Sequence, residues 1–75
     1  MQLGDGRLSG EVRWFDDKKY QGFIIPDAGG GDLFVHGSGL REPIAAGDRV
    51  LFEIARFRGR DTCVDVVKAG ARAPA

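Results

Sequence analysis

Cysteine, histidine and net charge are all scarce in this sequence of 75 residues, and each shortage excludes a class of protein. The single cysteine, Cys63, cannot build an internal disulfide framework. A lone thiol suits a reducing compartment, and we expect it to be a small buried hydrophobic side chain. One cysteine and one histidine do not make a metal site either. We therefore expect a protein without a disulfide, a metal ion or any other cofactor.

The charges balance, because 11 basic residues face 11 acidic ones. This balance excludes the broad basic surface with which many proteins hold duplex DNA through its phosphates, but it does not exclude a ligand held by stacking. The sequence has no apolar run long enough to cross a membrane and no signal-peptide pattern. It therefore predicts a cytoplasmic protein with no membrane partner.

Glycine is abundant, with 12 residues, and favours tight turns between short strands over helices. Alternating apolar and polar residues predict the strands themselves. The expected strands are 7–16, 20–26, 33–36, 48–56 and 62–68. A hairpin turn at 57–61, centred on Gly59, and at most one helical turn near 38–41 complete the pattern.

Strands of this number and length predict an all-β fold, a small antiparallel barrel or sandwich formed by one domain over residues 7–68. Residues 1–6 would be a loose N-terminal segment and 69–75 a flexible tail or linker. Alternation predicts a core with a contribution from every strand. Its expected members are Val12, Ile24, Leu33, Val35, Val50, Phe52, Ile54, Val64 and Val66.

Phe23, Phe34 and His36 have the opposite parity and should stand on the outside of the second and third strands. An exposed aromatic cluster on a small sheet indicates a binding surface. Flat nucleic-acid bases stack on aromatic rings with little sequence preference, and cations beside the rings can reach phosphates. A duplex hides its base faces, so this surface should prefer unpaired strands.

The stretch "GEVRWFDDKKYQGFIIPDAGGGDLFVHGSGL" (10–40) resembles the bacterial cold-shock domain. That family has a Gly-x-Val-Lys-Trp-Phe opening, a first motif Lys-Gly-Phe-Gly-Phe-Ile and a second motif Val-Phe-Val-His-Phe. The resemblance resumes at "GDRVLFEI" (47–54) and "VDV" (64–66). It implies a five-stranded antiparallel oligonucleotide-binding barrel that binds single-stranded RNA and DNA and acts as an RNA chaperone.

By position, the resemblance implies base stacking on Trp14, Phe23, Phe34 and His36, and it implies basic contacts from Arg13 and Lys19. Lys18 is a further candidate beside them. Phe15 matches an aromatic residue that supports the face. Simple alternation would turn Trp14 inward with Val12, but a bulge can reverse parity, and the resemblance puts Trp14 on the binding face.

The chain departs from the family at two stacking positions, where it has Gln21 and Gly37. Gln21 stays a candidate contact to the nucleic acid, because its position faces the ligand in the family. Tyr20 turned onto the face would restore one aromatic platform, and Phe57, next to Arg58, would supply another from the last hairpin. The arginines of this hairpin fit a solvated turn and a phosphate contact equally well. They are Arg56, Arg58 and Arg60.

No catalytic constellation is present. "AGGGD" lacks the Gly-Lys-Ser/Thr ending of a phosphate-binding loop, and "HGSGL" lacks the spacing of a nucleophile elbow. We therefore expect no enzyme and no small-molecule substrate. The sequence predicts a monomeric binder of single-stranded RNA or DNA, acting as an RNA chaperone or a regulator of expression.

The alternative is a protein-interaction module or homodimer with reduced nucleic-acid binding. In that case Phe23 and Phe34 would form a second small core beneath a partner. A separate alternative for His36 is a structural hydrogen-bonding role.

Overall fold

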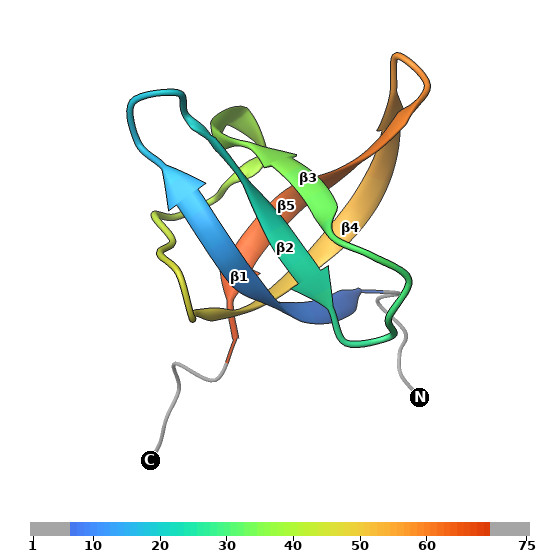
Figure 1. The fold of residues 1–75 in the computed structure, drawn as a ribbon, viewed down its shortest axis with the longest axis horizontal. Coiled ribbons are helices and arrows are strands. Elements are labelled where there is room, and N and C mark those ends of the chain that lie inside the picture. Colours follow the sequence, from blue (N-terminus) through green and yellow to red (C-terminus); the bar gives the residue numbers. More distant parts are fainter. Residues whose placement is uncertain (1–6, 70–75) are drawn as a thin grey trace.

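Residues 7–69, the part of the chain that the computed structural model describes, form a closed barrel (Figure 1). The elements are β1 (Leu8–Asp16), β2 (Gln21–Pro26), β3 (Leu33–His36), the 3₁₀ turn η1 (Gly37–Gly39), β4 (Arg49–Phe57) and β5 (Arg60–Lys68). The expected all-β barrel of five strands is confirmed. Residues 1–6, and the expected tail from residue 70 onward, lie outside the described residues.

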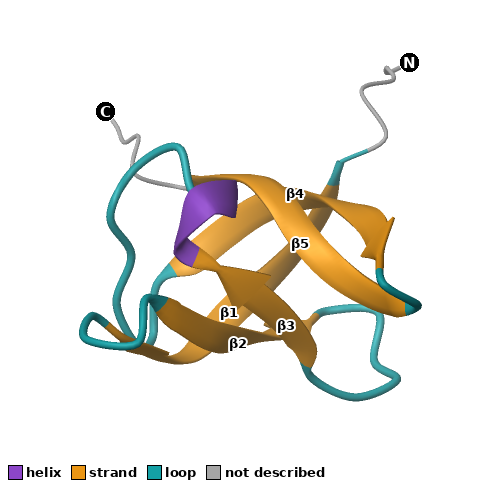
Figure 2. Ribbon diagram, turned by 90° about the horizontal axis from the view of Figure 1, so that it is seen from above, coloured by secondary structure: helices purple, strands orange, loops and turns teal. Residues whose placement is uncertain are grey.

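The order of the strands around the barrel is β1-β2-β3-β5-β4. Neighbouring strands pair antiparallel except β3 and β5, which meet in a short parallel contact, Phe34 with Thr62 and Val35 with Cys63. Within residues 7–69 the helical structure is the turn η1, close to the one expected at 38–41 (Figure 2). No helix there is long and apolar enough to cross a membrane.

The β4–β5 hairpin is tighter than the expected turn at 57–61. Phe57 pairs with Arg60, so Arg58 and Gly59 alone make the turn, and both have left-handed backbones with φ of 55° and 77°. Two-residue turns of this kind match the right-handed twist of the flanking strands. The hairpin therefore stays paired to its tip, which projects from the barrel at the upper right of Figure 1.

Among residues 7–69, eight apolar side chains are buried in the barrel interior. They are Val12, Ile24, Val35, Ile44, Val50, Phe52, Cys63 and Val66. Six of them were expected from the alternation, and the expected burial of Cys63 is confirmed. The half-buried Leu33 packs against this core, as do Phe15 and Leu40. Ile44 belongs to the loop between η1 and β4, where alternation gives no signal.

Two core predictions are wrong, for Ile54 and Val64. Ile54 has the same parity as Phe52, but the pairing of β4 with β1 ends at Phe52. Because β1 does not cover β4 beyond that point, Ile54 is 41% exposed. Val64 is only half-buried, and Cys63 takes its place in the core. The cause is a bulge in β5 that reverses the alternation between Val66 and Cys63.

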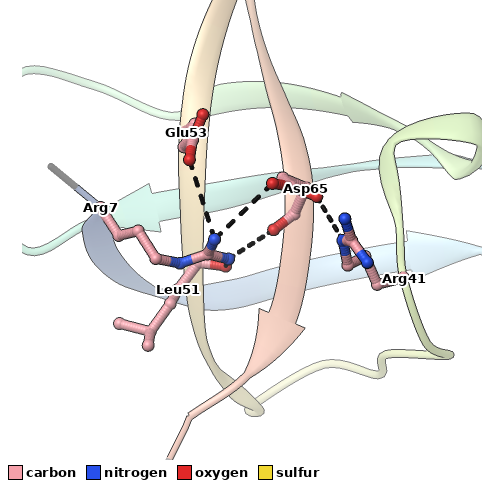
Figure 3. A network of polar contacts seen from close by, with 5 residues as sticks. All are labelled: Arg7, Arg41, Leu51, Glu53 and Asp65. Carbon is pink, nitrogen blue, oxygen red and sulfur yellow. Dashed lines mark hydrogen bonds and ion pairs between the residues drawn. The ribbon is translucent and has the colours of Figure 1, made fainter. Parts of the chain in front are cut away.

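This β5 bulge is visible in the register, because Leu51 pairs with Val67 while Glu53 pairs with Val64. Asp65 sits inside it with a φ of 57°. Two arginines bind it from opposite sides (Figure 3). Arg7 donates from Nη2 to the Asp65 carbonyl at 2.6 Å, and Arg41 pairs with the Asp65 carboxylate. The hydrogen bond from Arg41 lowers the pKa of the Asp65 carboxyl below its ordinary value.

Candidate nucleic-acid interface

Three aromatic rings form a row across β1, β2 and β3, one ring from each strand. Trp14 pairs in register with Phe23, and Phe23 with Phe34. The ring centroids are 5.3 Å apart in the first pair and 5.9 Å apart in the second. None of the three rings belongs to the buried core. We call Trp14, Phe23 and Phe34 the aromatic row.

Trp14 stands in this row because β1 carries a bulge. Val12 pairs with Ile24, whereas Trp14 pairs with Phe23, so Arg13 is an extra residue in β1. The bulge reverses the parity after the buried Val12 and leaves Trp14 39% exposed. Alternation alone would have buried Trp14, whereas the resemblance correctly placed it outside.

Gly22 keeps β1 and β2 close enough to hold this register. A Cβ at this position would lie 2.2 Å from the Trp14 carbonyl oxygen and 2.8 Å from the Phe15 Cα. Backbone atoms cannot yield to such an overlap without separating the strands. The absence of a side chain at Gly22 therefore helps to align Trp14 with Phe23.

His36 extends the face along β3, two positions after Phe34, and is exposed. Its Nδ1 accepts a hydrogen bond from the Ser38 backbone N–H at 3.1 Å and lies 2.9 Å from the Ser38 hydroxyl oxygen. Accepting through Nδ1 places the proton of the neutral ring on Nε2. The structural hydrogen bond of the alternative reading therefore exists, and it also fixes the orientation of the exposed ring.

The two departures from the family pattern lie around His36. Gln21 pairs with His36 in the β2–β3 register and is half-buried, so no ring occupies that position. Tyr20, at the end of the β1–β2 turn, brings its ring to 5.5 Å from the His36 ring. An aromatic side chain is thus present beside His36, although the turn supplies it and not the strand.

The β4–β5 hairpin adds an aromatic residue and two cations on the side of β3. Phe57 is 62% exposed, and with Phe34 and His36 it lines a shallow hollow of about 430 Å³. Arg58 lies over the Phe57 ring, with its guanidinium carbon 5.5 Å from the ring centroid. Arg60 lies over the Phe34 ring in the same way, at 5.1 Å. The hairpin therefore borders the aromatic row.

The predicted basic residues differ in their surroundings. Arg13 pairs with Asp32, with 2.5 Å between Nε and Oδ2, so part of its charge is already neutralised in the free protein. Lys18 and Lys19 are exposed in the β1–β2 turn, where the Asp16 carboxylate accepts their backbone N–H groups. The two lysines thus keep their side chains on the surface of the turn that carries Tyr20.

The remaining chemistry-bearing residue, Cys63, lies in the barrel core, where burial raises the pKa of its thiol to about 12. A thiol with that pKa stays protonated and unreactive near neutral pH. Among residues 7–69, no group of three or more histidine, cysteine, aspartate and glutamate side chains could hold a metal ion.

Residues 8–69 match the family model of the "cold-shock" DNA-binding domain. The chain belongs to the cold-shock domain family. The match covers all five strands of the barrel, including the aromatic row and the β4–β5 hairpin. Nucleic-acid binding is accordingly the function of this domain.

Relatives occur in plants and bacteria. The chain is 49% identical over 65 residues to glycine-rich protein 2 of Nicotiana sylvestris and 46% identical over 68 residues to cold shock domain-containing protein 4 of Arabidopsis thaliana. These matches cover 80% and 84% of this chain but only 30% and 34% of the plant proteins, about a third of their length. The cold shock-like protein CspE of Escherichia coli is 42% identical over 65 residues, which cover 81% of this chain and 94% of CspE.

Sequence reasoning missed the placement of Arg60 over Phe34 and the pairing of Arg13 with Asp32. The sequence shows the arginines of the hairpin as a cluster, but it does not show which ring each arginine covers. That depends on the parallel contact between β3 and β5, which brings Thr62 beside Phe34 and Arg60 onto the same side. A pairing between strands so distant in sequence leaves no local signal.

Proposed function

We propose that this cold-shock domain binds single-stranded RNA or DNA by stacking unpaired bases on the aromatic row and on His36. The row itself carries the proposal: three rings from three adjacent strands stand outside the core at 5.3 and 5.9 Å from one another. Such spacing suits successive bases of an extended strand. Each stacked base contributes about 1–3 kcal/mol and requires no particular sequence.

Capture of unpaired bases also supplies a mechanism for an RNA chaperone. A protein that binds the open form of an RNA and not its paired form shifts the equilibrium toward the open form by mass action. No chemical step is involved, and no catalytic residue is needed. In this proposal the domain acts in the cytoplasm, where single-stranded RNA is plentiful.

Trp14, the one tryptophan of the chain, provides the test. Single-stranded oligo-dT or oligo-U of about seven nucleotides should quench its fluorescence, because a base stacks on the exposed indole. A duplex of equal length should quench weakly, since its base faces are already stacked. Equal or stronger quenching by the duplex would contradict the proposal.

The matched control is Ile54→Ala. Ile54 is an exposed apolar side chain of β4, 41% accessible, that lines a different hollow together with Leu8 and Ala28. Its truncation should leave the titration unchanged. If no strand binds and the mass in solution rises with concentration, the aromatic row instead covers a second copy of the chain.

A further inference from the structure

Tyr20 has an unusual backbone for a large residue. Its φ is 59°, in the left-handed region, where a bulky side chain is strained. The turn is held in place on both sides: the Tyr20 N–H donates to the Asp16 carbonyl at 2.7 Å, and the Tyr20 carbonyl accepts from the Gly37 N–H at 2.7 Å. Backbone strain of this kind persists where the surroundings impose it, and it gathers at ligand-binding sites.

The Tyr20 ring occupies the space of a side chain at position 37. A Cβ built on Gly37 would lie 2.4 Å from Tyr20 Cδ1, 2.4 Å from Cε2 and 2.3 Å from Cε1. Cδ1 and Cε2 are on opposite sides of the ring, so a point equally close to both and to Cε1 stands over the ring face. The ring therefore lies flat against the Gly37 backbone.

The other neighbours of the ring meet it at steep angles. His36 is 5.5 Å away at 77° and Phe15 is 6.2 Å away at 75°. Neither of these two rings lies flat on Tyr20, and 52% of the residue is exposed. Beside it opens a hollow of about 390 Å³ lined by Phe15 and Leu40 among others. The ring thus has one supported face, an accessible surface and room for a nucleotide next to it.

We propose, on the basis of the single-strand function above, that Tyr20 is a base-stacking platform that replaces the side chain missing at Gly37. The tyrosine in the turn and the glycine after His36 form one exchange. Compared with the family pattern, an aromatic ring is absent at the end of β3 and present in the β1–β2 turn. The binding face then runs from the aromatic row past His36 and ends on Tyr20. Only one of positions 20 and 37 can carry a ring at a time.

A double-mutant cycle tests this exchange, with Trp14 fluorescence and oligo-dT of about seven nucleotides as the probe. Tyr20→Gly should weaken binding by roughly 5- to 150-fold, which corresponds to the loss of one stacked base. Glycine suits a φ of 59°, so this variant should remain folded in a thermal melt. Gly37→Phe should not strengthen binding in the presence of Tyr20, but in the Tyr20→Gly background it should recover most of the lost affinity.

Additive effects of the two substitutions would overturn the proposal, as would wild-type affinity of the Tyr20→Gly variant. Two further variants do not depend on Gly37→Phe folding. Tyr20→Phe keeps the ring and should bind like the wild type, whereas Tyr20→Leu keeps apolar bulk without a ring and should bind as weakly as Tyr20→Gly.

Phe34→Ala separates this inference from the function on which it rests. If Phe34→Ala weakens binding and Tyr20→Gly does not, the role of Tyr20 is wrong and the single-strand function stands. If neither variant changes the affinity of a folded protein, the aromatic face is not the binding site, and both proposals fail together.

Discussion

At the scale of single residues, Phe34 and Phe52 show how one residue type serves two purposes in a small barrel. Phe52 is fully buried in the core. Phe34 is half-buried outside it, with the Phe23 ring on one side and the Arg60 guanidinium over it. The first ring stabilises the fold, and the second is available for the base stacking that we propose.

Truncation of each ring should therefore affect a different measurement. Phe52→Ala should lower the free energy of unfolding by about 3–5 kcal/mol, because it leaves a cavity in the core. Phe34→Ala should lower it less and should weaken oligo-dT binding by about 1–3 kcal/mol. Denaturant unfolding and fluorescence titration measure the two quantities. The assignment of the faces is reversed if Phe34→Ala unfolds the domain and Phe52→Ala does not.

At the scale of the elements, bulges in β1 and β5 decide which side chains face outward and which face the core. The Arg13 bulge turns Trp14 outward, and the β5 bulge at Asp65 moves Cys63 into the core in place of Val64. In both strands one extra residue reverses the alternation. Asp65 takes a left-handed backbone there and is bound by Arg7 and Arg41.

The same bulges mark the limit of prediction from sequence. Period-two alternation identified the strands and the buried residues of regular segments, such as Ile24 and Val50, because a regular strand sends alternate side chains to opposite faces. It failed at Trp14 and Val64, where the alternation is broken. The ring of Tyr20 over Gly37 joins a turn to a distant glycine, and such a contact becomes visible only once the barrel has closed.

The β5 bulge should make stability depend on pH through Asp65. Its pKa is lowered from the ordinary 3.8, chiefly by the hydrogen bond to Arg41. The ionised carboxylate therefore stabilises the fold above that ordinary value, and this stabilisation is lost as the pH falls through the lower folded value. Asp65→Asn keeps a residue that tolerates the left-handed backbone and removes only the charge.

We expect Asp65→Asn to lower the thermal midpoint near neutral pH and to match the wild type in acid well below pH 3.8. Asp17→Asn, a change of the same kind in the exposed β1–β2 turn, is the control for the loss of one negative charge. If the thermal midpoint of Asp65→Asn lies below that of the wild type by the same amount in acid as near neutral pH, the carboxylate is not the stabilising group.

At the scale of the whole molecule, the balance of 11 basic and 11 acidic residues is reflected in the contacts of the cations. Those paired with carboxylates in the described residues are Arg7, Arg13, Arg41, Arg49, Arg56 and Lys68. Arg58 and Arg60 lie over aromatic rings instead, and Lys18 and Lys19 extend from the exposed β1–β2 turn. In the proposed complex, the cations available to phosphates are therefore few: Arg58 and Arg60 on the hairpin and Lys18 and Lys19 in the β1–β2 turn.

This arrangement predicts weak dependence of binding on salt. With two or three phosphates contacted and a slope of about −0.7 per contact for single strands, the logarithm of the binding constant should fall against the logarithm of salt concentration with a slope of roughly −1.4 to −2.1. Titrations of Trp14 fluorescence across a salt series measure it. Arg60→Ala should make this slope less steep by about 0.7, because the Arg60 guanidinium lies at the aromatic face. Arg49→Ala, which removes a cation already paired with Asp27, should leave it unchanged. A slope steeper than about −4 would mean that phosphates, and not stacked bases, dominate binding.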